Sequence, residues 1–125
     1  MKVVLDAGAF VAIDKRDRRI GAMLRVLQRQ RVPLWTSSAV VAQIWRDGRR
    51  QALVAQILGG VGARALAPGD DRRTGELLAR ARTSDVIDAH VALITDDGDQ
   101  VITSDPDDLE RLLRAREIDA SVVTA

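Results

Sequence analysis

Two short apolar runs that each end in an aspartate constrain the fold of this chain more than any other feature. Residues 2–5 are followed by Asp6, and residues 101–104 are followed by Asp105. Apolar runs of this length, separated by segments of helical periodicity, are typical of strands buried on both faces of a parallel sheet. Strand C-termini and helix N-termini share one edge of such a sheet, and ligands bind there. The sequence therefore predicts that carboxylates far apart along the chain meet at this edge.

A second pair of aspartates opens the apolar segment 84–94. Asp85 and Asp88 are three residues apart, so on a helix they project from the first turn in similar directions. Acids in a first turn also complement the helix dipole, and this role fits Asp85 as well as chemistry does. Asp88 lies deeper among apolar residues, where a carboxylate must be paired, hydrogen-bonded or bound to a metal.

The residues that follow the late apolar run have two interpretations. Asp105 and Asp108 have the spacing of a capping box around Pro106, so capping a helix explains them nearly as well as ligation does. Thr103 and Ser104 offer hydroxyls that could orient a water or contact a phosphate. If the carboxylates do cluster, they repel one another, and hard oxygen ligands around an open site suit Mg²⁺ or Mn²⁺.

Strands and helices are predicted to alternate along the chain. Apolar spacing after residue 19 indicates an amphipathic helix, and Ser37 or Ser38 can cap a helix that runs through Arg46. This alternation predicts the α/β class, with a short central parallel sheet covered by helices on both faces. A length of 125 residues fits one domain, 1–125. The predicted strands are 2–5, 32–36, 63–66, 100–103 and 121–124, and the predicted helices include 8–14, 49–58, 85–95, 106–116 and a segment from Asp70.

Composition removes several classes of site. The chain has no Cys, which excludes disulfides, thiolate zinc sites and cysteine nucleophiles, and a single His, which excludes sites built on several histidines. That residue, His90, is expected to be a hydrogen-bonded core histidine. A net charge of +1 gives no global field that would attract nucleic acid. No apolar run approaches the ~20 residues of a membrane span, so we expect a cytoplasmic protein.

A small basic cluster surrounds Gly48. Arg46, Arg49 and Arg50 could reach a phosphodiester backbone, or they could form a solvated helix end. The second interpretation is the more common one for a run of charges.

Four segments together resemble a known family. Each segment alone is a weak signal, but all four in this order, at this chain length, are similar to a PIN domain, and more specifically to a toxin of the VapC type from a toxin–antitoxin pair. The segments are Val3-Val4-Leu5-Asp6-Ala7-Gly8-Ala9-Phe10, then 36–46, Asp85-Val86-Ile87-Asp88-Ala89-His90-Val91-Ala92, and 101–108.

The resemblance implies a three-layer α/β/α fold and a ribonuclease that depends on Mg²⁺ or Mn²⁺. It implies that Asp6, Asp88 and Asp105 are the principal ligands of the ion, with the choice between Asp85 and Asp88 left open. It also implies an RNA substrate, a cognate antitoxin and a homodimer as partners. Supporting roles would fall to Gln43, Thr103, Ser104 and Asp108.

Gln43 departs from the family pattern, which usually has a Glu at this position. The amide keeps an oxygen that can bind a metal or a water, but it loses the charge. A charge pair at ~4 Å is worth ~4 kcal/mol at an effective dielectric of ~20, so metal binding is expected to weaken tenfold or more. This motivates an alternative: a PIN fold that binds RNA or an antitoxin without cutting.

A signalling receiver domain is a second alternative, because it has a similar length and an acidic pocket. That chemistry needs a Lys after a late strand, and the lysines of this chain are Lys2 and Lys15.

Overall fold

The structure is a computed structural model that describes all residues 1–125. A parallel sheet of five strands, in the order β3-β2-β1-β4-β5, runs through its centre. The strands are β1 (Val3–Leu5), β2 (Leu34–Ser37), β3 (Val61–Arg64), β4 (Gln100–Thr103) and β5 (Ser121–Thr124). The helices are α1 (Ala7–Asp14), α2 (Arg18–Arg29), α3 (Ser38–Ile44), α4 (Ala52–Leu58), α5 (Asp70–Ala81), α6 (Val86–Leu93) and α7 (Pro106–Ala115).

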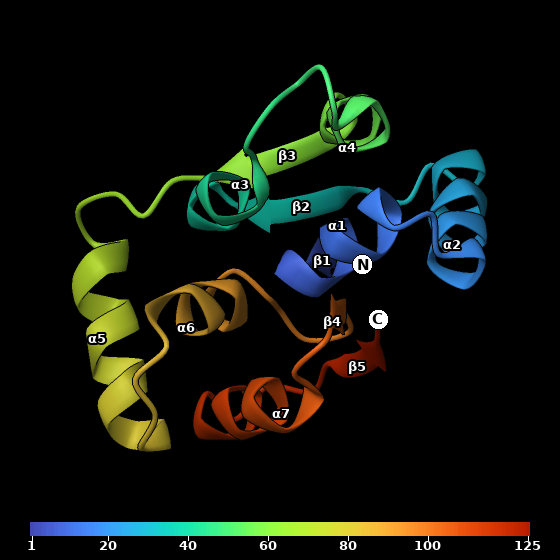
Figure 1. Cartoon of the computed structure of the whole chain (residues 1–125). Coiled ribbons are helices and arrows are strands. Elements are labelled where there is room, and N and C mark those ends of the chain that lie inside the picture. The colour runs from blue at the N-terminus through green and yellow to red at the C-terminus, as the bar shows by residue number, and fades with distance from the viewer.

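Strand order places the helices in two layers. The chain moves from β1 outward to β3 through α1–α4, then returns across β1 to β4 and β5 through α5–α7. Because parallel crossovers are right-handed, reversing the direction of travel moves the helices to the opposite face. Accordingly α1 packs with α2, α3 and α4, while α5, α6 and α7 pack with one another (Figure 1). The predicted three-layer α/β/α fold is confirmed.

The central strands are buried on both faces, as their apolar sequences predict. Val3, Val4 and Leu5 have no exposed surface, and β1 pairs with β2 on one side and β4 on the other. The core around them is aliphatic, and Phe10 is its one aromatic residue. None of the seven helices is both long and apolar enough to cross a bilayer.

The predicted helix ends on both sides of one loop were wrong. The helix expected over 49–58 begins at Ala52. The helix expected to run through Arg46 ends at Ile44, and Trp45 is already extended. The side chain of Gln51 replaces the lost helical partners, because its Oε1 accepts hydrogen bonds from the backbone N–H groups of Arg46 and Asp47 while its Nε2 donates to the Ile44 carbonyl. A single buried amide thus stabilises the loop between α3 and α4.

The third strand lies two residues earlier than predicted. Its register with β2 pairs Trp35 with Gly62, and the indole ring lies against this glycine. A Cβ on Gly62 would come within 2.8 Å of the ring, so the strand needs a glycine where an apolar side chain would be expected.

Candidate metal centre

The candidate metal site lies between β1 and β4, where the order of the strands in the sheet reverses direction. β1 and β4 are neighbours, but one leads to a helix on one face of the sheet and the other to a helix on the opposite face. Such a switch point leaves a crevice at the C-terminal ends of the two strands. Asp6 follows β1 directly, and Thr103 is the last residue of β4, two residues before Asp105.

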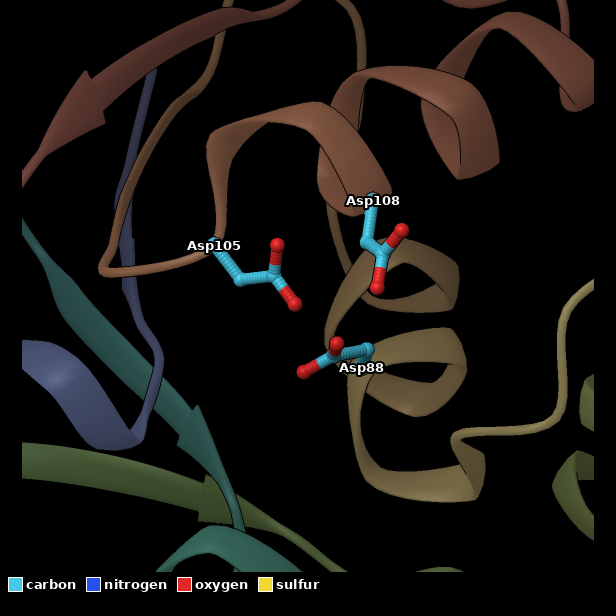
Figure 2. A group of neighbouring side chains, drawn as sticks. All are labelled: Asp88, Asp105 and Asp108. Carbon is cyan, nitrogen blue, oxygen red and sulfur yellow. The ribbon is translucent and has the colours of Figure 1, made fainter.

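Three carboxylates converge beside this point. Each of Asp88, Asp105 and Asp108 offers an oxygen, and the three oxygens lie within 4.8 Å of one another. Figure 2 shows Asp88 projecting from α6 towards Asp105, at the start of α7, and Asp108, in its first turn. Asp88 is buried, Asp108 is half-buried and Asp105 is exposed, so the cluster has one side open to solvent. The sequence predicted this meeting of α6 with the end of β4.

Thr103 connects Asp6 to Asp105. The buried Thr103 hydroxyl donates to Asp6 Oδ2 at 2.7 Å and accepts from the Asp105 backbone N–H at 3.0 Å. Asp6 is also the N-cap of α1, because its Oδ1 accepts from the Ala7 backbone N–H at 2.8 Å, so capping of this helix is one role that its sequence position allows. The Thr103 hydroxyl thus orients Asp6 and the turn before Asp105. The contact of Thr103 with a water or a phosphate stays a prediction. Ser104 is exposed and its hydroxyl remains available.

Hydrogen bonds separate the capping aspartates from the others. Asp85 Oδ1 accepts from the Asp88 backbone N–H at 3.0 Å, so it caps α6 and also holds the turn that carries Asp88. Asp105 occupies the cap position of α7 but its side chain forms no capping bond. The capping explanation therefore holds for Asp85 and fails for Asp105, whose carboxylate is left facing Asp88 and Asp108.

The cluster carries charge that the fold alone does not neutralise. Burial, and then the charges of Asp6, Asp85, Asp105 and Asp108, raise the pKa of Asp88 from 3.8 to about 7. Burial is also the largest cause that raises the pKa of Asp6, and burial followed by Asp108 raises that of Asp105. A divalent cation would remove this repulsion, and the all-oxygen donor set fits Mg²⁺ or Mn²⁺. The residues present therefore fit the ion that the sequence suggested.

The remaining predicted residues lie outside this cluster. Gln43 is exposed on α3, and its side chain forms no hydrogen bond to the carboxylates. Arg46, Arg49 and Arg50 are exposed in the loop between α3 and α4, where Arg46 Nη1 donates to the carbonyls of its own helix end. Their roles in binding water or RNA stay predictions.

Two features of the site were missed at the sequence level. Gly8 in α1 lies against Ser104, since a Cβ on Gly8 would come within 2.5 Å of the Ser104 Cβ, backbone nitrogen and hydroxyl. His90 is a hydrogen-bonded core residue, as expected, but its partners Ser37 and Asp70 were not anticipated. A fully buried imidazole needs partners for both ring nitrogens, and this requirement was the available signal.

Comparison with solved structures identifies the architecture. One chain of the crystal structure of VapBC2 from Rickettsia felis bound to a DNA fragment from their promoter matches with a TM-score of 0.69, over 98% of this chain and 99% of that chain. The fold is PIN-like. Sequence identity is 16%, so the resemblance to a PIN domain of the VapC type is confirmed at the level of the fold. No protein-family model and no curated protein sequence matches the chain.

Proposed function

We propose that this chain is a divalent-metal-dependent ribonuclease, the toxin of a toxin–antitoxin pair. The observation that carries the proposal is the convergence of the Asp88, Asp105 and Asp108 carboxylates at the strand switch point. Asp105 makes no capping bond, and Asp88 is buried beside like charges, so a bound cation would stabilise both carboxylates. The PIN-like fold supports the same activity.

Each acidic residue has a distinct role in this proposal. Asp88 and Asp105 hold the ion, with Asp6 as the third principal ligand, directly or through water. Asp108 adds a third, half-buried carboxylate to the cluster. Asp85 fixes the first turn of α6 through its bond to the Asp88 backbone. Thr103 and the Ala7 backbone N–H each donate to one Asp6 oxygen and so fix the orientation of this carboxylate. When bound, Mg²⁺ or Mn²⁺ supplies the activation of water and the neutralisation of charge on the phosphate.

The partners are proposed from the fold and from exposed side chains. The structural neighbour belongs to a VapBC2 complex, which supports an antitoxin that binds this chain. We further propose a cytoplasmic homodimer, with RNA as substrate. The exposed guanidinium groups of Arg46, Arg49 and Arg50 are the candidate phosphate contacts, since Arg forms bidentate bonds with phosphate.

Cleavage of labelled RNA tests the proposal. With Mn²⁺ the wild-type protein is expected to cut RNA, and the same reaction with EDTA should show no product. Asp105→Asn and Asp6→Asn should each lower the rate by about 100- to 1000-fold, since losing one charge from the ion's ligands costs ~3–4 kcal/mol at an effective dielectric of ~20. Asp107→Asn, which changes an exposed acid two residues from Asp105, is the matched control and should cut at the wild-type rate. Equal rates for Asp105→Asn and Asp107→Asn would contradict the site.

Gln43 favours one alternative, a domain that binds RNA or an antitoxin but does not cleave. The missing charge at this position and the exposure of its side chain both point to weaker metal binding. RNA binding without cleavage, in either Mg²⁺ or Mn²⁺, would support this alternative.

Gln43→Glu is expected to tighten Mg²⁺ binding about tenfold if residue 43 moves to face the cluster when the ion binds. Calorimetric titration of both proteins measures this effect directly. An unchanged affinity would show that residue 43 takes no part in the site.

A further inference from the structure

A buried chain of hydrogen bonds runs through the protein beside the carboxylate cluster. Ser37 Oγ lies 2.7 Å from His90 Nδ1, and His90 Nε2 lies 3.1 Å from Asp70 Oδ2. Both Asp70 oxygens also accept from Arg64, from Nε at 2.8 Å and Nη2 at 2.7 Å. Ser37 and His90 have no exposed surface. The chain therefore joins the ends of β2 and β3 to α5 and α6.

The direction of each bond follows from the charges. Hydrogen bonds from Arg64 and His90 lower the pKa of Asp70, so its carboxylate is ionised and can only accept. His90 Nε2 must therefore carry a proton. In the neutral ring Nδ1 is then an acceptor, and the Ser37 hydroxyl donates to it while accepting from the Ala39 backbone N–H at 3.1 Å. With this one arrangement of protons, the Ser37 hydroxyl, both ring nitrogens of His90 and both carboxylate oxygens of Asp70 each have a hydrogen-bond partner.

This Ser-His-Asp chain is not built for nucleophilic catalysis. The Ser37 hydroxyl is fully buried and caps α3, so no substrate can reach it without unfolding the helix start. A hydroxyl that already accepts from a backbone N–H and has no access to solvent is a structural group. The hydrogen bonds among Ser37, His90 and Asp70 therefore have a structural role.

Their position on α6 indicates what that role is. His90 follows Asp88 by two residues, so the two side chains project from α6 about 200° apart. One face of the helix carries Asp88 to the carboxylates of Asp105 and Asp108 at the start of α7, so like charges oppose the packing of α6 on α7 at this point. The opposite face carries His90 into the hydrogen-bonded chain, which holds the helix against β2 and α5.

We propose that Ser37, His90 and Asp70 form a tether that holds α6 in place against carboxylate repulsion and so positions Asp88 for the divalent ion. All three are positioning residues, since none contacts the ion or the substrate. The last step, from helix position to ion binding, rests on the proposed function. The tether itself depends on the fold alone.

Nuclear magnetic resonance of ¹⁵N-labelled histidine tests the tether without any assay of activity. His90 is the only histidine in the chain, so its ring nitrogens give unambiguous signals. The proposal requires the neutral tautomer with the proton on Nε2, or a doubly protonated ring, and a ring proton protected from exchange. Ser37→Ala should shift the Nδ1 resonance, and Ser37→Thr, which keeps the hydroxyl, should restore it. A wild-type ring protonated on Nδ1 alone would overturn the proposal.

Hydrogen exchange and metal titration then test the consequence for α6. In metal-free Ser37→Ala and Asp70→Asn, α6 amides should exchange at least tenfold faster than in the wild type. The control is Thr74→Val, which removes a buried α5 hydroxyl with no partner, one turn from Asp70. Exchange in α6 that is equal in Ser37→Ala and Thr74→Val would overturn the tether.

Mn²⁺ affinity should fall about tenfold with either tether variant, as is usual for groups that orient ligands. Unchanged Mn²⁺ affinity in both variants would overturn the positioning step. A wild-type protein that binds no Mn²⁺ would refute the proposed function and that step, while the ring signals and exchange rates still decide the tether.

Discussion

Replacing Asp88 with asparagine is expected to reduce metal-dependent RNA cleavage by about 100- to 1000-fold and, at the same time, to stabilise the metal-free protein. The loss of rate follows from removing one unit of charge from the ion's ligands, worth ~4 kcal/mol at an effective dielectric of ~20. The gain in stability follows from burial, and then from the like charges around it, which together raise the pKa of this carboxyl from 3.8 to about 7. Few substitutions at an ordinary buried acid would have both effects.

The sign of the stability effect depends on pH. Because the folded state holds the Asp88 proton more tightly than the unfolded chain does, the stabilisation from this group is complete below pH 3.8 and is lost as the pH rises towards 7. Asparagine stays neutral and escapes this loss. The variant should therefore match the wild type near pH 4 and exceed it at pH 8 by about 1–3 kcal/mol, a value reduced for partial hydration of the site.

Urea unfolding in EDTA at pH 4, 6 and 8 measures this difference. Saturating Mn²⁺ should reverse the ranking at pH 8, because a bound ion stabilises the wild type and not the variant. A metal-free Asp88→Asn protein that is less stable than the wild type at pH 8 would show that Asp88 is not crowded by like charges.

Gly8→Ala is expected to damage both the fold and the site. The new Cβ would come within 2.5 Å of the backbone nitrogen of Ser104, a clash that no side-chain rotation relieves. Either α1 or the turn after β4 must move, which should lower the free energy of unfolding by about 1–3 kcal/mol. Since Asp105 directly follows Ser104, we expect Mn²⁺ affinity to fall about tenfold as well. Thermal unfolding and calorimetry measure the two effects.

Gly21→Ala provides the matched control. Gly21 is also helical, in α2, but a Cβ there meets no atom within 4 Å. The substitution should raise stability by up to about 1 kcal/mol through helix propensity, and it should leave Mn²⁺ binding unchanged. Similar losses for the two variants would mean that contact with Ser104 does not explain the need for glycine at position 8.

Much of the fold follows from local sequence patterns. The apolar runs at β1 and β4, and the alternation of strands with helices, were sufficient for the α/β class and for the edge at which Asp6 and Asp105 emerge. The weakest predictions concern element bounds that are set by side chains and strands outside the element itself. β3 is set by its register with β2 and by the ring of Trp35 on Gly62, and the end of α3 is set by the side chain of Gln51.

For the candidate site too, local patterns predict the positions of the acidic residues but not the contacts that they make. Spacing alone places an acid at the start of α6 and another at the start of α7, but it cannot separate a helix cap from a free carboxylate. That distinction depends on single hydrogen bonds: Asp85 makes its capping bond and Asp105 does not. The partners of His90 lie on two other elements, so no local pattern could indicate them.

Diffraction from crystals soaked in Mn²⁺ would show whether the three carboxylates bind an ion. We expect an anomalous peak in contact with carboxylate oxygens of Asp88 and Asp105, beside Asp6, and no peak there in crystals of Asp88→Asn. Wild-type crystals that show no peak at this cluster in saturating Mn²⁺, or a peak bound by other residues, would contradict the proposed metal site.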